Sequence, residues 1–174
     1  MPQPFDLRRF IRDVPDFPKP GILFRDVTPL LGDRDALRAA VRSLADPFRG
    51  DRVDQVLGVE SRGFVLGAPV ALELGAGFAM VRKQGKLPYE TRRVTYDLEY
   101  GTDTVEMHVD AVRPGQRVLL VDDLIATGGT AAAAVRLARE AGADVVGCAF
   151  LIELSGLAGR PRLGVERVHV LLDY

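Results

Sequence analysis

Residues 117–130, RVLLVDDLIATGGT, combine two adjacent acids with a glycine-containing segment that ends in threonine. Glycines let backbone N–H groups approach an anion closely, and a helix that begins there adds a partial positive charge. The hydroxyl groups of Thr127 and Thr130 can donate hydrogen bonds as well. Asp122 and Asp123 can accept hydrogen bonds from sugar hydroxyls and attract Mg²⁺ or its bound waters. A ribose 5-phosphate unit, with a phosphate beside a diol, fits this order of groups.

Two other phosphate-binding motifs are missing from the sequence. It contains no GxxxxGK[ST], so hydrolysis of a nucleoside triphosphate by a Walker loop is unsupported, and no GxGxxG follows the first predicted strand. The segment also lacks the lysine of a Walker loop. We therefore expect the phosphate to be gripped and not transferred.

The elements around this segment alternate between strands and helices. Continuous apolar runs predict strands, and apolar residues at helical spacing predict the helices that follow them. Such alternation favours a central, mostly parallel sheet flanked by helices, with ligands beyond the carboxyl ends of the strands. We expect strands at 55–59, 77–83, 117–121, 144–154 and 168–174, and helices at 5–12, 35–48, 64–75 and 129–142. Residues 84–95 are expected to form a polar loop, and 96–100 and 104–110 a hairpin or an irregular flap.

Length and composition indicate one ordinary globular domain covering residues 1–174. The chain is 47% hydrophobic and 27% charged, with a net charge of −1, so neither nucleic acid nor an anionic membrane is an expected partner. The single cysteine, Cys148, excludes an internal disulfide. The charged first residues do not read as a secretory signal, and no apolar run reaches the ~20 residues that span a bilayer. We therefore expect a cytoplasmic protein.

Four further stretches join VDDLIATGGT in a family resemblance. The chain resembles the type I phosphoribosyltransferases, and within them the enzymes that act on adenine. The resemblance covers essentially the whole chain. It rests on PDFPKPGILFRDVTPLL (15–31), GVESRGFVLG (58–67), VRKQGKLP (81–88) and YDLEYG (96–101), in the family's order.

The resemblance implies a fold, a reaction and an assembly. The fold would be the α/β type I phosphoribosyltransferase fold, with a small N-terminal base-binding hood at 1–34 and a flexible catalytic flap at 82–104. Adenine and phosphoribosyl pyrophosphate (PRPP) would give AMP and pyrophosphate, with Mg²⁺ held mainly by PRPP or pyrophosphate and water. The family is dimeric, so a homodimer is expected, with part of the basic segment 81–88 reaching the neighbouring subunit's site.

Residue roles follow from the chemistry that the resemblance implies. Breaking the bond between C1′ and pyrophosphate creates an oxocarbenium-like ribose and a highly charged leaving group, which fixed donors and cations stabilise. Ser61 and Arg62 would contact pyrophosphate from a loop that in this family contains a non-proline cis peptide. Arg82, Lys83 and Lys86 would add positive charge, and loop 84–95 would close to exclude water. Arg62 and Lys83 are the expected catalytic cations.

The remaining assignments concern the base and the phosphate. Glu99 is the expected catalytic carboxylate near the imidazole edge of adenine. The base would stack between Phe24 and either Leu124 or Ile125, with backbone groups of Phe24 and Arg25 reading its edge. Asp122 and Asp123 would bind the ribose hydroxyls, and the phosphate would lie against Ala126, Thr127, Gly128, Gly129 and Thr130.

Two alternatives stay open at this point. The first is a phosphoribosyltransferase for hypoxanthine, guanine or xanthine. The second is a regulator that keeps this fold to sense a nucleotide, although regulators of that kind usually carry a nucleic-acid-binding addition, and neither spare length nor a basic patch is visible.

Overall fold

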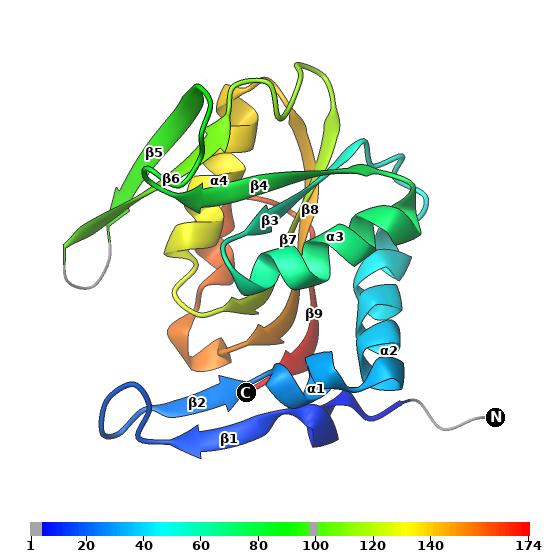
Figure 1. Cartoon of the computed structure of the whole chain (residues 1–174), viewed down its shortest axis with the longest axis vertical. Coiled ribbons are helices and arrows are strands. Elements are labelled where there is room, and N and C mark those ends of the chain that lie inside the picture. Colours follow the sequence, from blue (N-terminus) through cyan, green and yellow to red (C-terminus); the bar gives the residue numbers. More distant parts are fainter. Residues whose placement is uncertain (1–4, 98–100) are drawn as a thin grey trace.

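The structure is a computed structural model that describes residues 5–97 and 101–174. It is built around a seven-stranded sheet with a separate two-stranded sheet near the N-terminus (Figure 1). In chain order the elements are η1 Leu7–Phe10, β1 Arg12–Pro15, β2 Leu23–Asp26, α1 Thr28–Gly32, α2 Arg34–Ala45, η2 Asp46–Phe48, β3 Gln55–Val59, α3 Arg62–Leu74, β4 Gly77–Lys83, β5 Thr91–Asp97, β6 Thr102–His108, β7 Arg117–Ile125, α4 Gly129–Glu140, β8 Asp144–Glu153, η3 Ser155–Leu157, η4 Arg160–Leu163 and β9 Val168–Asp173.

The large sheet has the strand order β5-β6-β4-β3-β7-β8-β9. Strands β4, β3, β7, β8 and β9 run parallel, whereas β6 pairs antiparallel with both β4 and β5. The expectation of a mostly parallel α/β sheet is confirmed. Among the described residues no helix is both long and apolar enough to cross a membrane.

Helices cover both faces of the sheet, as the apolar strands predict. Alternate residues of β3 divide between two cores: Leu57 packs with the apolar face of α4, and Val56 packs with α2 and α3. In Figure 1, α4 and α3 lie on opposite sides of the central strands. Asp33 caps α2 by accepting hydrogen bonds from the backbone N–H groups of Asp35 and Ala36, which selects it over Gly32 as the N-cap.

Three boundaries differ from the sequence-based expectation. The segment 84–95 is not a loop throughout, because β5 begins at Thr91 and pairs with β6 over its whole length. Strand β7 continues through the two aspartates to Ile125, because β8 offers it a parallel partner as far as Glu153. The expected helix at 5–12 is a short 3-10 turn, after which β1 forms a hairpin with β2.

Candidate active site

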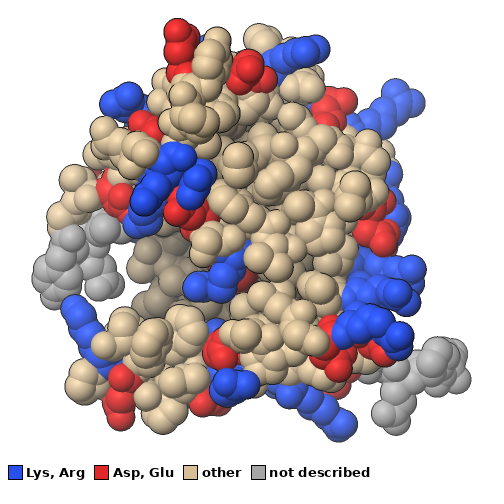
Figure 2. All heavy atoms as spheres, viewed as in Figure 1, with Lys and Arg blue, Asp and Glu red and all other residues tan. Residues whose placement is uncertain are grey.

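A cavity of about 330 Å³ opens at the carboxyl ends of β3 and β7. This is the edge of a parallel sheet where strand-to-helix loops meet and ligands bind. Figure 2 shows a hollow on the same face, between the β1–β2 hairpin below and the body of the molecule above, with basic and acidic atoms interspersed around it. The cavity is lined by Val59, Glu60, Ser61, Arg62, Lys83, Asp122, Asp123, Leu124, Ile125, Ala126, Thr127, Gly128, Gly129, Thr130 and Ala131.

The loop at 126–130 forms one end of the cavity and leads directly into α4. Gly128 is the N-cap of α4 and has φ = +78°, a left-handed conformation that glycine adopts without steric cost. A Cβ atom there would also overlap the backbone carbonyl of Gly159, which packs over the loop. The loop therefore requires glycine at 128 on two independent grounds. Its N–H groups and the N-terminus of α4 make a site suited to a phosphate.

Neighbouring segments hold this loop from outside. Arg162 donates from Nη1 to the carbonyl of Thr127 at 3.3 Å. The Oγ1 of Thr130 shares a hydrogen bond of 2.9 Å with the hydroxyl of Tyr96, and a Cβ at Gly129 would lie 3.3 Å from the Tyr96 ring. The loop is thus fixed by η4 on one side and by β5 on the other.

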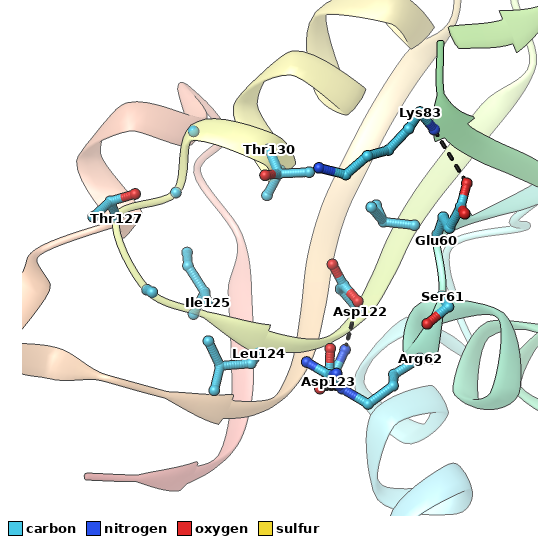
Figure 3. A pocket seen from close by; sticks show the side chains of 15 residues that line it. Glu60, Ser61, Arg62, Lys83, Asp122, Asp123, Leu124, Ile125, Thr127 and Thr130 are labelled. Atoms are coloured by element: carbon cyan, nitrogen blue, oxygen red, sulfur yellow. Dashed lines mark hydrogen bonds and ion pairs between the residues drawn. The ribbon is translucent and has the colours of Figure 1, made fainter. Parts of the chain in front are cut away.

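The two aspartates have different environments, because successive residues of a strand point to opposite sides. Asp123 is buried and accepts a hydrogen bond from Nε of Arg62, the first residue of α3. Burial lowers the pKa of Arg62, but the hydrogen bond from Asp123 and the charges of both aspartates outweigh it and raise that pKa overall. Burial, followed by the charge of Asp123, raises the pKa of Asp122 well above its usual range. In Figure 3, Asp122 points into the cavity, and Arg62 lies against Asp123.

The loop between β3 and α3 forms the opposite wall. The peptide bond between Glu60 and Ser61 is cis, as the family resemblance predicts. Glu60 accepts hydrogen bonds from Nε of Arg82 at 3.0 Å and from the backbone N–H of Lys83 at 3.2 Å. The hydrogen bond from Arg82 lowers the pKa of Glu60, which therefore stays ionised.

Lys83 ends β4 and extends along the cavity toward Thr130 (Figure 3). Its Nζ donates to Asp103 of β6 at 2.5 Å. This hydrogen bond raises the pKa of Lys83 and lowers the pKa of Asp103, although burial opposes both shifts.

The cavity does not contain every residue that the sequence suggests. Eleven of the predicted residues line it: Ser61, Arg62, Lys83, Asp122, Asp123, Leu124, Ala126, Thr127, Gly128, Gly129 and Thr130. Four others lie outside its lining: Phe24, Arg25, Arg82 and Lys86. Glu99 lies outside the described residues.

The four residues outside the lining have other neighbours. The Phe24 ring has the guanidinium of Arg62 5.8 Å from its centroid, so it lies next to a residue of the cavity wall. Arg25 stacks its guanidinium over Tyr174 and pairs with Asp13. Arg82 donates to Glu60 and also to the carbonyl of Lys86, at 3.1 Å.

Sequence reasoning missed three residues at this site. Glu60 lines the cavity, but its identity alone does not reveal that it holds Arg82. Tyr96 and Asp103 contact Thr130 and Lys83 from the β5–β6 hairpin. The alternation of polar and apolar residues in 91–108 is the signal that could have paired these strands, but it does not set their register against β4.

Comparison with known proteins places the chain in a family. The phosphoribosyl transferase domain family matches residues 31–169. An adenine phosphoribosyltransferase from Rhodopirellula baltica is 52% identical over 172 residues, covering 99% of this chain and 84% of the relative.

Solved structures give the same result. The crystal structure of adenine phosphoribosyltransferase from Rhodothermus marinus is 57% identical, with a TM-score of 0.92 and coverage of 97% of this chain and 96% of that one. The Saccharomyces cerevisiae enzyme, complexed with adenine and an imino-altritol bisphosphate, is 40% identical, with a TM-score of 0.90 and coverage of 95% and 96%. The chain therefore belongs to the phosphoribosyltransferase family, in its adenine phosphoribosyltransferase branch.

Proposed function

We propose that the cavity at the ends of β3 and β7 binds PRPP and carries out phosphoribosyl transfer to adenine, giving AMP and pyrophosphate. The chain is a pentosyltransferase by family, and the proposal concerns the site and its residues. The observation that carries it is that one cavity joins the loop 126–130, two carboxylates and two cations. A 5-phosphate fits the loop, ribose hydroxyls fit Asp122 and Asp123, and pyrophosphate fits Ser61, Arg62 and Lys83.

The charges in this arrangement suit the reaction. As the bond between C1′ and pyrophosphate breaks, positive charge develops on the ribose and negative charge on the leaving group. Asp122 and Asp123 lie where carboxylates stabilise the first, and Arg62 and Lys83 where cations stabilise the second. Arg62 is held by Asp123, so the guanidinium is oriented before the leaving group forms.

Mg²⁺ is part of the proposal, held mainly by PRPP or pyrophosphate and by water. The described residues contain no cluster of three or more potential metal ligands. Asp123 is engaged by Arg62, and the raised pKa of Asp122 makes it a poor direct ligand. The donor set therefore fits a metal that the pyrophosphate carries in, with carboxylates reaching its waters. Once bound, Mg²⁺ would neutralise charge on the leaving group.

Adenine is proposed to lie between Phe24 and the side chain of Leu124 or Ile125. The nearness of Phe24 to Arg62 supports this placement, since Arg62 lines the same cavity as both aliphatic residues. Backbone groups of Phe24 and Arg25 would read the base edge. Glu99 stays a prediction from the sequence: Glu99→Ala should lower turnover more than nucleotide affinity, and an equal fall in both would contradict a catalytic role.

A homodimer is also proposed. Leu72 of α3 is 82% exposed, and Val65 lies seven residues earlier on the same helix, where side chains share a face. Arg82 and Lys86 lie outside the cavity of their own chain, which is compatible with a role at a neighbouring subunit's site. Sedimentation across a dilution series, with activity measured in parallel, tests whether a dimer is the active form. Cytoplasmic location remains a prediction from the sequence.

Purified protein with PRPP, Mg²⁺ and each purine in turn tests the activity. We expect AMP and pyrophosphate from adenine and far slower conversion of hypoxanthine, guanine or xanthine. Faster turnover of hypoxanthine than of adenine would contradict the assignment of the base. Absence of any PRPP-dependent product with all four bases, together with binding of AMP, would favour a nucleotide sensor.

A further inference from the structure

Three side chains on the antiparallel part of the sheet form a connected group beside the cavity. Lys83 of β4 is opposite Val105 of β6. Asp103 lies two residues before Val105, so it shares a sheet face with Val105 and is a diagonal neighbour of Lys83. Tyr96 of β5 is directly opposite Asp103. The register of three adjacent strands thus brings an amine, a carboxylate and a phenol together.

Asp103 holds its position through several donors. Its carboxylate accepts from Nζ of Lys83 at 2.5 Å, from the hydroxyl of Tyr96 at 3.3 Å and from the backbone N–H of Thr104 at 2.8 Å. The Asp103 side chain is 20% exposed and that of Lys83 is 59% exposed. The carboxylate is therefore anchored, whereas the lysine reaches it with a flexible and partly solvated chain.

Tyr96 connects this group to the phosphate end of the cavity. Its hydroxyl lies 2.9 Å from Oγ1 of Thr130, at the start of α4, and its ring packs beside Gly129. The ring is partly buried, and burial raises the pKa of Tyr96, so its hydroxyl stays protonated as a donor at neutral pH. The chain of contacts runs Lys83, Asp103, Tyr96, Thr130.

We propose that Asp103 is a positioning residue that holds the ammonium group of Lys83 at the cavity wall and exchanges it with pyrophosphate. The inference deepens the proposed function and rests on it. Lys83 has one ammonium group, and a pyrophosphate in the cavity would compete with Asp103 for it. Asp103 stays anchored by Thr104 and Tyr96 when the lysine moves. It therefore weakens the binding of pyrophosphate and recaptures Lys83 when pyrophosphate leaves.

The direction of this effect separates exchange from a merely structural role. If Asp103 only maintained the fold of the hairpin, its removal would weaken the binding of every ligand. If Lys83 is exchanged, removal of Asp103 frees the ammonium group and strengthens the binding of pyrophosphate. AMP carries no pyrophosphate, so its affinity should not change.

Asp103→Asn is the decisive variant, with binding of magnesium pyrophosphate and of AMP measured by calorimetry. An exposed ion pair contributes about 0.2–1 kcal/mol, so we expect pyrophosphate to bind up to about fivefold more tightly. AMP affinity should stay at the wild-type value. Weaker binding of pyrophosphate, or equal tightening for AMP, would overturn the inference. Asp103→Thr removes the same charge with a residue that suits a strand and is held to the same outcome.

Two further variants control the result. Glu140→Gln removes one negative charge from the exposed pair between Arg136 and Glu140, away from the cavity, and should leave pyrophosphate affinity unchanged. Tyr96→Phe removes one anchor of Asp103 and should tighten pyrophosphate less than Asp103→Asn does. Tightening by Glu140→Gln equal to that by Asp103→Asn would overturn the exchange.

Turnover by the wild-type protein keeps the two proposals distinguishable. If the wild type converts adenine and PRPP to AMP but Asp103→Asn does not tighten pyrophosphate, the exchange alone is wrong. If the wild type makes no AMP, the proposed function is wrong whatever the variants bind. With both proposals right, Asp103→Asn should also release pyrophosphate more slowly in a stopped-flow displacement experiment.

Discussion

The two ends of the cavity present hydrogen-bond donors of different kinds. At the phosphate end, residues 126–130 offer backbone N–H groups, two hydroxyls and the start of α4, and none of these residues carries a formal charge. At the other end the donors are side-chain cations, and each contacts an acid: Arg62 with Asp123, Lys83 with Asp103, and nearby Arg82 with Glu60. The phosphate end is a fixed cradle, whereas the pyrophosphate end is a set of ion pairs.

This difference has a consequence for catalysis. The phosphate stays on the ribose throughout the reaction, so a rigid site of neutral dipoles suits it. Pyrophosphate must be stabilised as it departs and then released, so its site must bind a changing charge without holding the product. Cations already paired with acids can do both, because part of each new contact is offset by a contact that is lost. We therefore expect substitutions to act differently at the two ends.

The largest effect is expected from Gly128→Ala at the phosphate end. A non-glycine residue in the left-handed conformation costs about 1–2 kcal/mol, and the added Cβ would also overlap the carbonyl of Gly159. We expect PRPP and AMP affinity to fall more than tenfold, since 1.4 kcal/mol is a factor of ten. Calorimetry with AMP measures this directly. Gly156→Ala, where a Cβ meets nothing within 4 Å, is the matched control and should bind AMP normally.

Asp123→Asn should have the next largest effect. Asparagine keeps the shape and one acceptor for Arg62 but removes the charge that orients the guanidinium. A single hydrogen bond contributes about 0.5–1.5 kcal/mol, so PRPP affinity should fall by up to about tenfold, with an unchanged circular dichroism spectrum. Asp144→Asn, which weakens the exposed pair between Arg117 and Asp144 away from the cavity, should leave PRPP binding intact. Unchanged PRPP kinetics in Asp123→Asn would remove Asp123 from the site.

The same contrast governs what the sequence could predict. The phosphate end is one contiguous stretch, and glycines, threonines and a following apolar helix identify it from residue types alone. The parallel strands were predictable for the same reason, because their apolar runs are continuous. Only the end of β7 was placed four residues early, since its continuation depends on pairing with β8.

The pyrophosphate end depends on contacts between distant residues. Arg62 and Asp123 are 61 positions apart, and Lys83 and Asp103 are 20 apart. Sequence reasoning named Arg62, Lys83 and Asp123 but not their pairing, nor Asp103 or Tyr96, because strand register decides which side chains meet. The β1–β2 hairpin was missed because its prolines favour turns and irregular structure.

Asp122→Asn should separate stability from binding. Burial raises the folded-state pKa of Asp122 above the unfolded value near 3.8, so the folded state binds this proton more tightly. The stability from this group is present at low pH and is lost as pH rises from about 4 through the folded pKa. At neutral pH Asp122→Asn should therefore raise Tm, by about 2–4 °C for each kcal/mol gained, while weakening PRPP binding.

The pH profile of stability checks the cause. Asp122→Asn should flatten the fall in Tm between pH 4 and the folded pKa, and Asp110→Asn, at an exposed turn position, should not. A lower Tm for Asp122→Asn at pH 7 would contradict the assignment of a destabilising buried carboxylate.

The smallest effect is expected from ionic strength, which compares the two ends without any substitution. Salt screens interactions between exposed charges, and the side chains of Lys83 and Arg62 are both about half exposed. Backbone dipoles of a fixed loop are less affected, because they carry no net charge to screen. Raising the salt concentration should therefore weaken the binding of pyrophosphate by a larger factor than the binding of AMP, as measured by calorimetry in a series of chloride concentrations. Asp103→Asn should steepen the dependence for pyrophosphate, since the freed ammonium group then makes a full ion pair with the ligand. An equal salt dependence for the two ligands would mean that the ends of the cavity bind anions by the same physical means, and the contrast between cradle and ion pairs would be wrong.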